Sequence, residues 1–118
     1  MDTIQAKNDA FRKVVMFAPH PDGKAVMTPG VASLGSAVCA WIYKEIAEFD
    51  NFTEDNDPYG DHDFGSVTVS VSNLMTDEDE THKVFWKIDY YEDADMEFGA
   101  EDKLNAYRVL VIMLSEEY

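Results

Sequence analysis

The residues best suited to chemistry lie in one short acidic segment, Asp55-Asn56-Asp57-Pro58-Tyr59-Gly60-Asp61-His62-Asp63. Calcium loops place oxygen ligands at positions 1, 3, 5, 7 and 9, a glycine at position 6 and a bidentate glutamate at position 12. Counted from Asp55, the other aspartates and the glycine match this spacing, but Tyr59 stands at position 5 and Ser66 at position 12. The segment is thus a partial match to a cation site. The alternative is a structural loop whose Asp and Asn side chains form local turns.

His62 is the residue in this segment that could act as a general base or a metal ligand, paired with Asp61 or Asp63. A zinc site needs about four nitrogen or sulfur ligands, and Cys39, His20 and His82 are far away in sequence. Phosphate-binding, dinucleotide-binding and nucleophile-elbow motifs are missing from the chain. We therefore predict no catalytic residue, metal or cofactor, and keep a cation-binding or hydrolytic domain as an alternative.

The charge of the chain is concentrated in its middle. Residues 45–102 hold 19 of the 24 carboxylates and two of the nine Lys and Arg, a formal charge of −17 within a total of −15. Such a field opposes direct binding to nucleic acid or anionic lipid, which need basic patches, and favours basic partners. The simplest interpretation is a solvated surface that keeps the protein soluble.

A second interpretation is that the carboxylates of segments 50–65, 76–81 and 92–102 imitate the phosphates of DNA. This requires that the three segments lie on one side of the protein. A basic nucleic-acid-binding groove would then accept the protein in place of DNA.

The elements that must position these residues indicate one domain of 118 residues, with 46% hydrophobic residues. The order of elements predicts an α+β fold, a small antiparallel sheet with about three helices packed on it. Thr3 is the expected N-cap of the first helix, and Gly35 suggests close packing against a neighbour. We predict helices over 4–15, 31–49 and 102–118, strands over 24–28, 67–71 and 82–91, and acidic connections over 50–65, 73–81 and 92–99.

The first helix is expected to bury a stripe of Ile4, Lys7, Ala10, Phe11 and Val14. Alternation along 82–91 places Trp86 and Tyr90 in the core, and we expect Trp41 to be structural as well. The single Cys39 cannot form an internal disulfide. With no secretory pattern at Met1-Asp2-Thr3 and no long apolar run, a cytoplasmic protein is expected.

Four parts of the chain carry a family likeness. They are Val26-Met27-Thr28-Pro29-Gly30-Val31, residues 49–65 (FDNFTEDNDPYGDHDFG), residues 84–91 (VFWKIDYY) and residues 108–118 (RVLVIMLSEEY). They resemble a small bacterial family known only as a domain of unknown function, found in alphaproteobacteria and on plasmids and other mobile elements. The resemblance implies no activity or site residue, but a mobile-element context favours a role against host defence. Asp77-Glu78-Asp79-Glu80 departs from the family pattern, like an insert.

These observations predict a non-enzymatic, acidic nucleic-acid mimic that inhibits a host defence protein of the CRISPR or restriction type by blocking its target DNA. It is expected to contact neither nucleic acid nor membrane. A general interaction module for a basic partner is the other alternative. The predicted partner-binding residues are Glu54, Asp55, Asp57, Asp61, Asp63, Asp77, Glu78, Asp79, Glu80, Asp93, Asp95 and Glu97.

Overall fold

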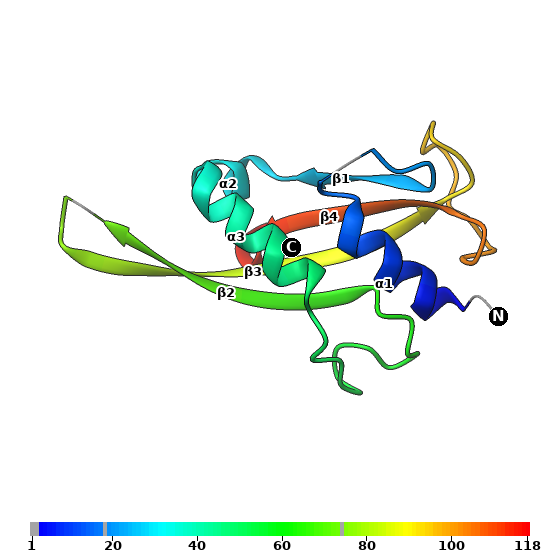
Figure 1. Ribbon diagram of the computed structural model, residues 1–118, viewed down its shortest axis with the longest axis horizontal. Helices are drawn as coiled ribbons and strands as arrows, with labels where there is room; N and C mark the ends of the chain where they lie inside the picture. The colour runs from blue at the N-terminus through cyan, green and yellow to red at the C-terminus, as the bar shows by residue number, and fades with distance from the viewer. Residues whose placement is uncertain (1–2, 18, 74) are drawn as a thin grey trace.

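The computed structural model describes residues 3–17, 19–73 and 75–118 (Figure 1). Met1, Asp2 and Leu74, to which the predictions at the N-terminus and the hairpin tip extended, lie outside the described residues. The elements are α1 (Ile4–Val14), β1 (Gly23–Met27), α2 (Pro29–Ala32), α3 (Ser36–Ala47), β2 (Phe64–Asn73), β3 (Glu78–Tyr91), β4 (Tyr107–Leu114) and a short 3-10 helix η1 (Ser115–Glu117).

The strands form a four-stranded sheet in the order β1-β4-β3-β2. β2 pairs with β3 and β3 with β4 in antiparallel fashion, whereas β1 runs parallel to β4. The predicted α+β class and the number of helices are confirmed, but the sheet is mixed and not purely antiparallel. The parallel pair joins elements near the two ends of the chain, and alternation within single segments contains no signal for such a pairing.

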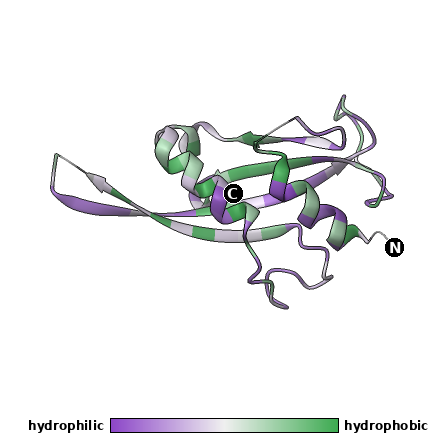
Figure 2. Ribbon diagram, in the orientation of Figure 1, coloured by the Kyte–Doolittle hydropathy of each residue, from purple (hydrophilic) through white to green (hydrophobic). Residues whose placement is uncertain are grey.

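The three helices cover one face of the sheet (Figure 1). The register places Val84, Trp86 and Ile88 of β3 opposite Leu114, Ile112 and Leu110 of β4, so these side chains share the covered face. They are buried against the three helices, through Phe11 of α1, Val31 of α2, and Cys39, Ile42 and Ile46 of α3. Figure 2 shows this apolar interior in green and the polar hairpin tip and loops in purple.

The predicted closing helix over 102–118 is wrong, because this part of the chain forms the central strand β4. Its residues are almost all apolar, and most are buried on both faces of the sheet. A strand buried on both faces has no alternation, so its apolar run resembles a buried helix. The predicted number of helices is right only because the expected helix over 31–49 divides into α2 and α3.

Gly35 causes that division. It adopts φ +98°, in the region that favours glycine, and no atom lies within 4 Å of a Cβ built on it. The prediction that Gly35 allows close packing is therefore wrong. Gly35 instead turns the chain between the two helices.

α1 forms as predicted, with the Thr3 side chain accepting a hydrogen bond of 3.0 Å from the Ala6 amide. Its buried face is rotated from the predicted one: Asn8, Phe11 and Arg12 are buried, whereas Val14 is exposed. The helix therefore buries two polar side chains, and their partners lie in the site described below.

Of three further predictions, one is confirmed and two differ from the structure. The acidic connection over 73–81 is shorter than expected, because β3 begins at Glu78 and places Glu78, Asp79 and Glu80 in a strand. Trp86 is fully buried and Tyr90 packs against the core, as predicted. Trp41 is 41% exposed and is not a core residue.

Gly65 lets the indole of Trp86 approach β2. A Cβ at this position would lie 2.7 Å from Trp86 Nε1 and 2.8 Å from Phe49 Cζ. We expect Gly65→Ala to lower the free energy of unfolding by about 1–3 kcal/mol, the usual cost of overpacking. Urea denaturation measures this loss, and Ser66→Ala, on the next residue and the opposite face, is the control. Equal stability of Gly65→Ala and the control would contradict the packing described.

Candidate functional site

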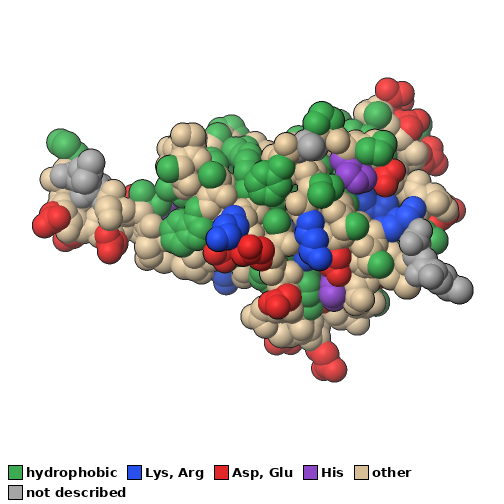
Figure 3. Space-filling view, viewed as in Figure 1, with side chains coloured by type: hydrophobic (Ala, Val, Ile, Leu, Met, Phe, Trp, Pro, Cys, Tyr) green, Lys and Arg blue, Asp and Glu red, His purple; other side chains and the backbone are tan. Residues whose placement is uncertain are grey.

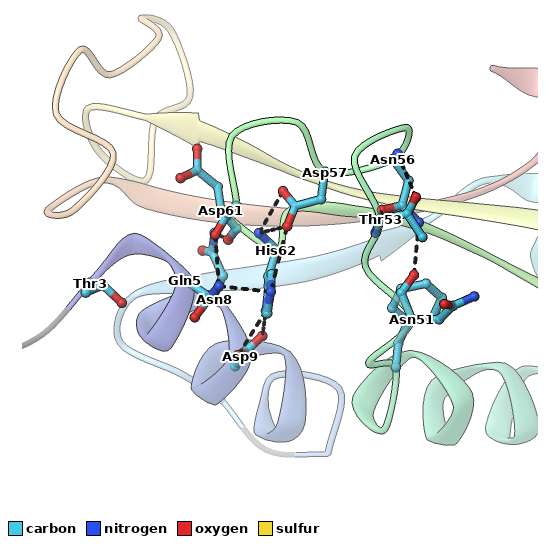
Figure 4. A network of polar contacts seen from close by, with 12 residues as sticks. Thr3, Gln5, Asn8, Asp9, Asn51, Thr53, Asn56, Asp57, Asp61 and His62 are labelled. Carbon is cyan, nitrogen blue, oxygen red and sulfur yellow. Dashed lines mark hydrogen bonds and ion pairs between the residues drawn. The ribbon is translucent and has the colours of Figure 1, made fainter.

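The segment singled out in the sequence forms a folded loop beside α1 (Figure 4). Asn56 closes its first turn, since its side-chain oxygen accepts from the Thr53 amide at 2.9 Å and its side-chain nitrogen donates to the Asn51 carbonyl at 3.0 Å. Gly60 makes the second reversal with φ +71°. These contacts are those of the structural loop that the sequence offered as an alternative.

His62 holds this loop against α1. Its Nδ1 lies 2.9 and 3.1 Å from the two carboxylate oxygens of Asp9, and its Nε2 lies 3.0 Å from the side-chain nitrogen of Gln5. The ring stacks on Phe52 with 3.7 Å between ring centroids. The pairing with Asp61 or Asp63 that was considered from the sequence does not form, because the histidine pairs with a helix residue 53 positions away. With both ring nitrogens engaged and one face covered, the geometry fits an anchor.

Asp57, Asp61 and Asp63 are committed to contacts within the protein. The Asp57 side chain is 5% exposed, and its two oxygens lie 3.2 and 3.3 Å from the His62 amide, which donates to them. Asp61, 19% exposed, pairs with Lys103 at 3.6 Å. Asp63 accepts a hydrogen bond of 2.9 Å from the Tyr90 hydroxyl. Of the predicted residues in this loop, only Glu54 and Asp55 are exposed.

The calcium-like spacing does not produce a clustered site. Among the residues that the structure describes, no group of three or more His, Cys, Asp or Glu side chains is placed to hold a metal ion. Asp57, Asp61 and Asp63, three of the four aspartates that matched the spacing, instead contact the protein's own donors.

Burial of Asp63 should make the stability of the protein depend on pH. Partial burial raises the pKa of this carboxyl, the charges of Asp61 and Asp57 raise it further, and the Tyr90 hydroxyl and Lys103 act in the opposite direction. The folded state then holds the proton to a higher pH than the unfolded chain, so this group's contribution to stability is present below the unfolded pKa of about 3.9 and is lost as pH rises through the folded value.

We expect Asp63→Asn, which keeps an acceptor for Tyr90, to gain stability relative to the natural protein as pH rises above about 4. Urea denaturation at a series of pH values measures the difference. Asp55→Asn, on an exposed carboxylate of the same loop, is the control. A difference that stays constant or shrinks with rising pH would contradict the assignment.

A second buried network joins α1 to the sheet. Asn8 donates to the Asp61 carbonyl at 2.9 Å and lies 2.7 Å from the Tyr90 hydroxyl. Its side-chain oxygen accepts from Nε of Arg108 at 2.7 Å. Arg108 also donates to the carbonyls of Ala106 and Lys103. This arginine is 1% exposed, so its guanidinium contacts groups inside the fold and not solvent.

Arg12 is the central residue of the site, and it is not among the residues predicted from the sequence. Its guanidinium donates to the carbonyls of Ile46 at 2.8 Å and Phe49 at 2.9 Å, which lie at the C-terminal end of α3, and to Asp9 at 3.1 Å. It also lies over the ring of Trp86, 4.9 Å from the centroid. A cationic side chain at a helix C-terminus donates hydrogen bonds to the free carbonyls and interacts favourably with the helix dipole. The same guanidinium lines a cavity of about 300 Å³ together with Asp9 and His62.

The three acidic segments lie at three separate ends of the molecule. In Figures 1 and 3 the hairpin tip lies at the left, the 50–63 loop at the bottom and the loop after β3 at the upper right. They lie apart from one another along the outline of a molecule of 50 × 31 × 23 Å. We call the exposed acids among the predicted partner-binding residues the acidic rim: Glu54, Asp55, Asp77, Glu78, Asp79, Glu80, Asp93, Asp95 and Glu97.

Within the described part of the chain, no helix combines the length and the apolar character that crossing a membrane requires. No curated protein and no solved structure matches the chain. A family model described as "Protein of unknown function (DUF3768)" matches residues 27–117. This match covers most of the chain and confirms the likeness to a domain-of-unknown-function family. It includes the 50–63 loop, the hairpin and β4, so the chain belongs to the DUF3768 family.

Proposed function

We propose that this protein is a non-enzymatic inhibitor that places its acidic rim in the nucleic-acid groove of a basic host defence protein, such as a CRISPR effector or a restriction enzyme. The rim carboxylates stand in for phosphates, and target DNA is kept out while the complex persists. The proposal places the protein in the cytoplasm, where such partners meet DNA.

The observation that carries the proposal is the distribution of exposed charge. The carboxylates of the rim are exposed at both ends of the 50 Å long axis, in a chain with a net charge of −15. DNA presents an extended array of negative phosphates to the basic grooves that bind it. A curved groove in the partner can contact such a rim along its length, so the acidic segments need not form one continuous face.

The burial of both arginines strengthens this field. Arg12 and Arg108 are 2% and 1% exposed and bind backbone carbonyls, so exposed positive charge comes from lysines. Blue side chains are few in Figure 3, whereas red ones occupy all three ends. A basic partner therefore meets a surface with little local repulsion, the condition for fast, charge-steered association.

A defence protein is chosen as the partner class because of the family resemblance, which associates similar chains with plasmids and mobile elements. Such elements benefit from a protein that keeps a DNA-cleaving enzyme off their own DNA. This choice is the part of the proposal that depends on association with the family, and the charge argument holds without it.

A phage-plating assay tests the proposal in cells. Bacterial strains that each carry one CRISPR or restriction system are challenged with a targeted phage, with and without this protein. We expect the protein to raise plating on at least one strain, and a rim variant with Asp77→Asn, Glu78→Gln, Asp79→Asn and Glu80→Gln to lose that protection at equal protein level. Protection that is unchanged in the variant, or absent from every strain, would contradict the proposal.

A further inference from the structure

Among the described residues, the sheet ends in two edge strands, β1 and β2, and the edge formed by β2 is the longer one. The ten residues of β2 contain no charged residue and no proline. Exposed strand edges carry unpaired N–H and C=O groups that attract other strands, and proteins usually protect them with charge, proline or a bulge. The sequence of β2 provides neither charge nor proline.

The free backbone groups of β2 can be assigned from its pairing with β3. The Ile88 amide donates to the Asp63 carbonyl at 2.9 Å, and hydrogen-bonded and non-hydrogen-bonded positions alternate along an antiparallel pair. Ser66, Thr68 and Ser70 therefore direct their N–H and C=O groups away from β3. Among the described residues, no backbone hydrogen bond from a loop, turn or cap reaches these three.

A groove runs between this edge and α3. It has a volume of about 370 Å³, and its lining includes Glu45, Glu48 and Asp50 on the helix side and Ser66 and Thr68 on the strand side. One wall therefore offers carboxylates and the other offers backbone groups.

Trp41 lies on the same face of α3 as Glu45 and Glu48, at spacings of four and seven residues. It is 41% exposed, and its indole N–H donates to the Glu45 carboxylate at 3.2 Å. An exposed tryptophan with a polar partner is a common feature of protein interfaces.

We propose that this groove binds a basic polypeptide segment in extended conformation, which adds to the sheet as a fifth strand beside β2. Its backbone pairs with Ser66, Thr68 and Ser70, and every second side chain, a lysine or arginine, reaches the carboxylates of Glu45 and Glu48. Strand addition of this kind gives affinity through the main chain and specificity through alternate side chains. The groove residues are not part of the acidic rim, so this inference holds whether or not the rim binds a defence protein.

The charge of the groove selects its occupant. A second copy of this chain would bring its own Glu45, Glu48 and Asp50, and a net charge of −15, against the same residues. Nucleic acid and acidic peptides are repelled for the same reason. A basic strand is the occupant that satisfies both the free backbone groups and the carboxylates.

A synthetic peptide of about eight residues that alternates arginine and valine, close to the length of β2, tests the inference. Its binding is followed by Trp41 fluorescence, with Trp41→Phe as the reference, and by hydrogen exchange of individual amides in NMR spectra. We expect the peptide to slow exchange at Ser66, Thr68 and Ser70. The double variant Glu45→Lys/Glu48→Lys should weaken binding about tenfold or more, because attraction becomes repulsion.

The matched control is Asp93→Lys/Asp95→Lys, which makes the same change in net charge on the rim and should leave peptide affinity nearly unchanged. A second peptide with N-methyl groups on alternate amides keeps the charge but cannot pair with β2, and it should not bind. Equal binding of the methylated peptide, or equal weakening by the control variant, would overturn the inference. A dimer in sedimentation with those three amides protected in the absence of peptide would also overturn it, because a second copy would then be the occupant.

Discussion

Replacing Arg12 with methionine is expected to lower the free energy of unfolding by several kcal/mol, since two backbone carbonyls lose their donor at about 1–3 kcal/mol each. The substitution leaves the carbonyls of Ile46 and Phe49 without their donor and Asp9 without its cation. Burial lowers the pKa of Arg12, and Asp9 acts in the opposite direction. An arginine pKa lies so far above neutrality that the guanidinium stays charged.

Lys13→Met is the matched control for this variant, because it removes a positive charge from the exposed neighbour of Arg12. Surface substitutions usually change stability by about 0.5 kcal/mol or less. Urea denaturation of both variants at neutral pH measures the difference. If Arg12→Met loses no more stability than Lys13→Met, Arg12 does not hold α3 and the 50–63 loop together.

The second large effect concerns the rate of association with the proposed basic partner. Neutralising the hairpin tip and the loop after β3, with Asp77→Asn, Glu78→Gln, Asp79→Asn, Glu80→Gln, Asp93→Asn, Asp95→Asn and Glu97→Gln, is expected to slow association about 10–1000-fold at low salt. Steering of this kind depends on the summed field and is screened by salt. Stopped-flow mixing at two salt concentrations measures both effects.

A control with a smaller charge change separates location from total charge. The variant Glu45→Gln/Glu48→Gln/Asp50→Asn neutralises three acids beside the β2 edge, and Asp93→Asn/Asp95→Asn/Glu97→Gln neutralises three on the rim. We expect the rim variant to slow association more. Equal slowing by the two variants would show that only net charge matters and that the rim is not the docking surface.

The first helix, the helical character of residues 31–49, the β2–β3 hairpin and the Thr3 cap could be predicted because each depends on a local pattern. Alternation in 67–71 and 82–91 placed Val84, Trp86 and Ile88 on one face, and the structure confirms this. β4 could not be recognised, since a strand buried on both faces reads as an unbroken apolar run. Its parallel pairing with β1 joins residues more than 80 positions apart.

The site was harder to predict than the fold. Buried Asn8 and Arg12 are polar residues on a helix, and such residues are normally assigned to the exposed face. One signal was available: Asn8, Phe11, Arg12 and Val15 follow the i, i+3, i+4, i+7 spacing of a core stripe. The partners of Asn8 and Arg12 are mostly groups on other elements, including backbone carbonyls and the Arg108 side chain, and no side-chain pattern points to a carbonyl.

The calcium-like spacing illustrates the converse case. The spacing of Asp55, Asp57, Asp61 and Asp63 matched a ligand pattern, but the chain directs Asp57 to the His62 amide, Asp61 to Lys103 and Asp63 to Tyr90. Aspartates in a Gly- and Pro-containing loop serve turns and local hydrogen bonds as readily as ions. The spacing of the aspartates alone could not show whether they bind an ion or form hydrogen bonds within the protein.

Displacement of DNA from a purified partner tests the central claim most directly. A fluorescent target duplex is bound to each of a set of CRISPR effectors and restriction enzymes, and this protein is titrated in while fluorescence anisotropy is recorded. The account predicts that at least one enzyme releases its duplex when this protein is added. The rim variant with Asp77→Asn, Glu78→Gln, Asp79→Asn and Glu80→Gln should displace the duplex only at much higher concentration, and added salt should weaken the competition. If no enzyme in the set releases its duplex, or if the rim variant competes as well as the natural protein, the acidic rim does not act as a substitute for DNA.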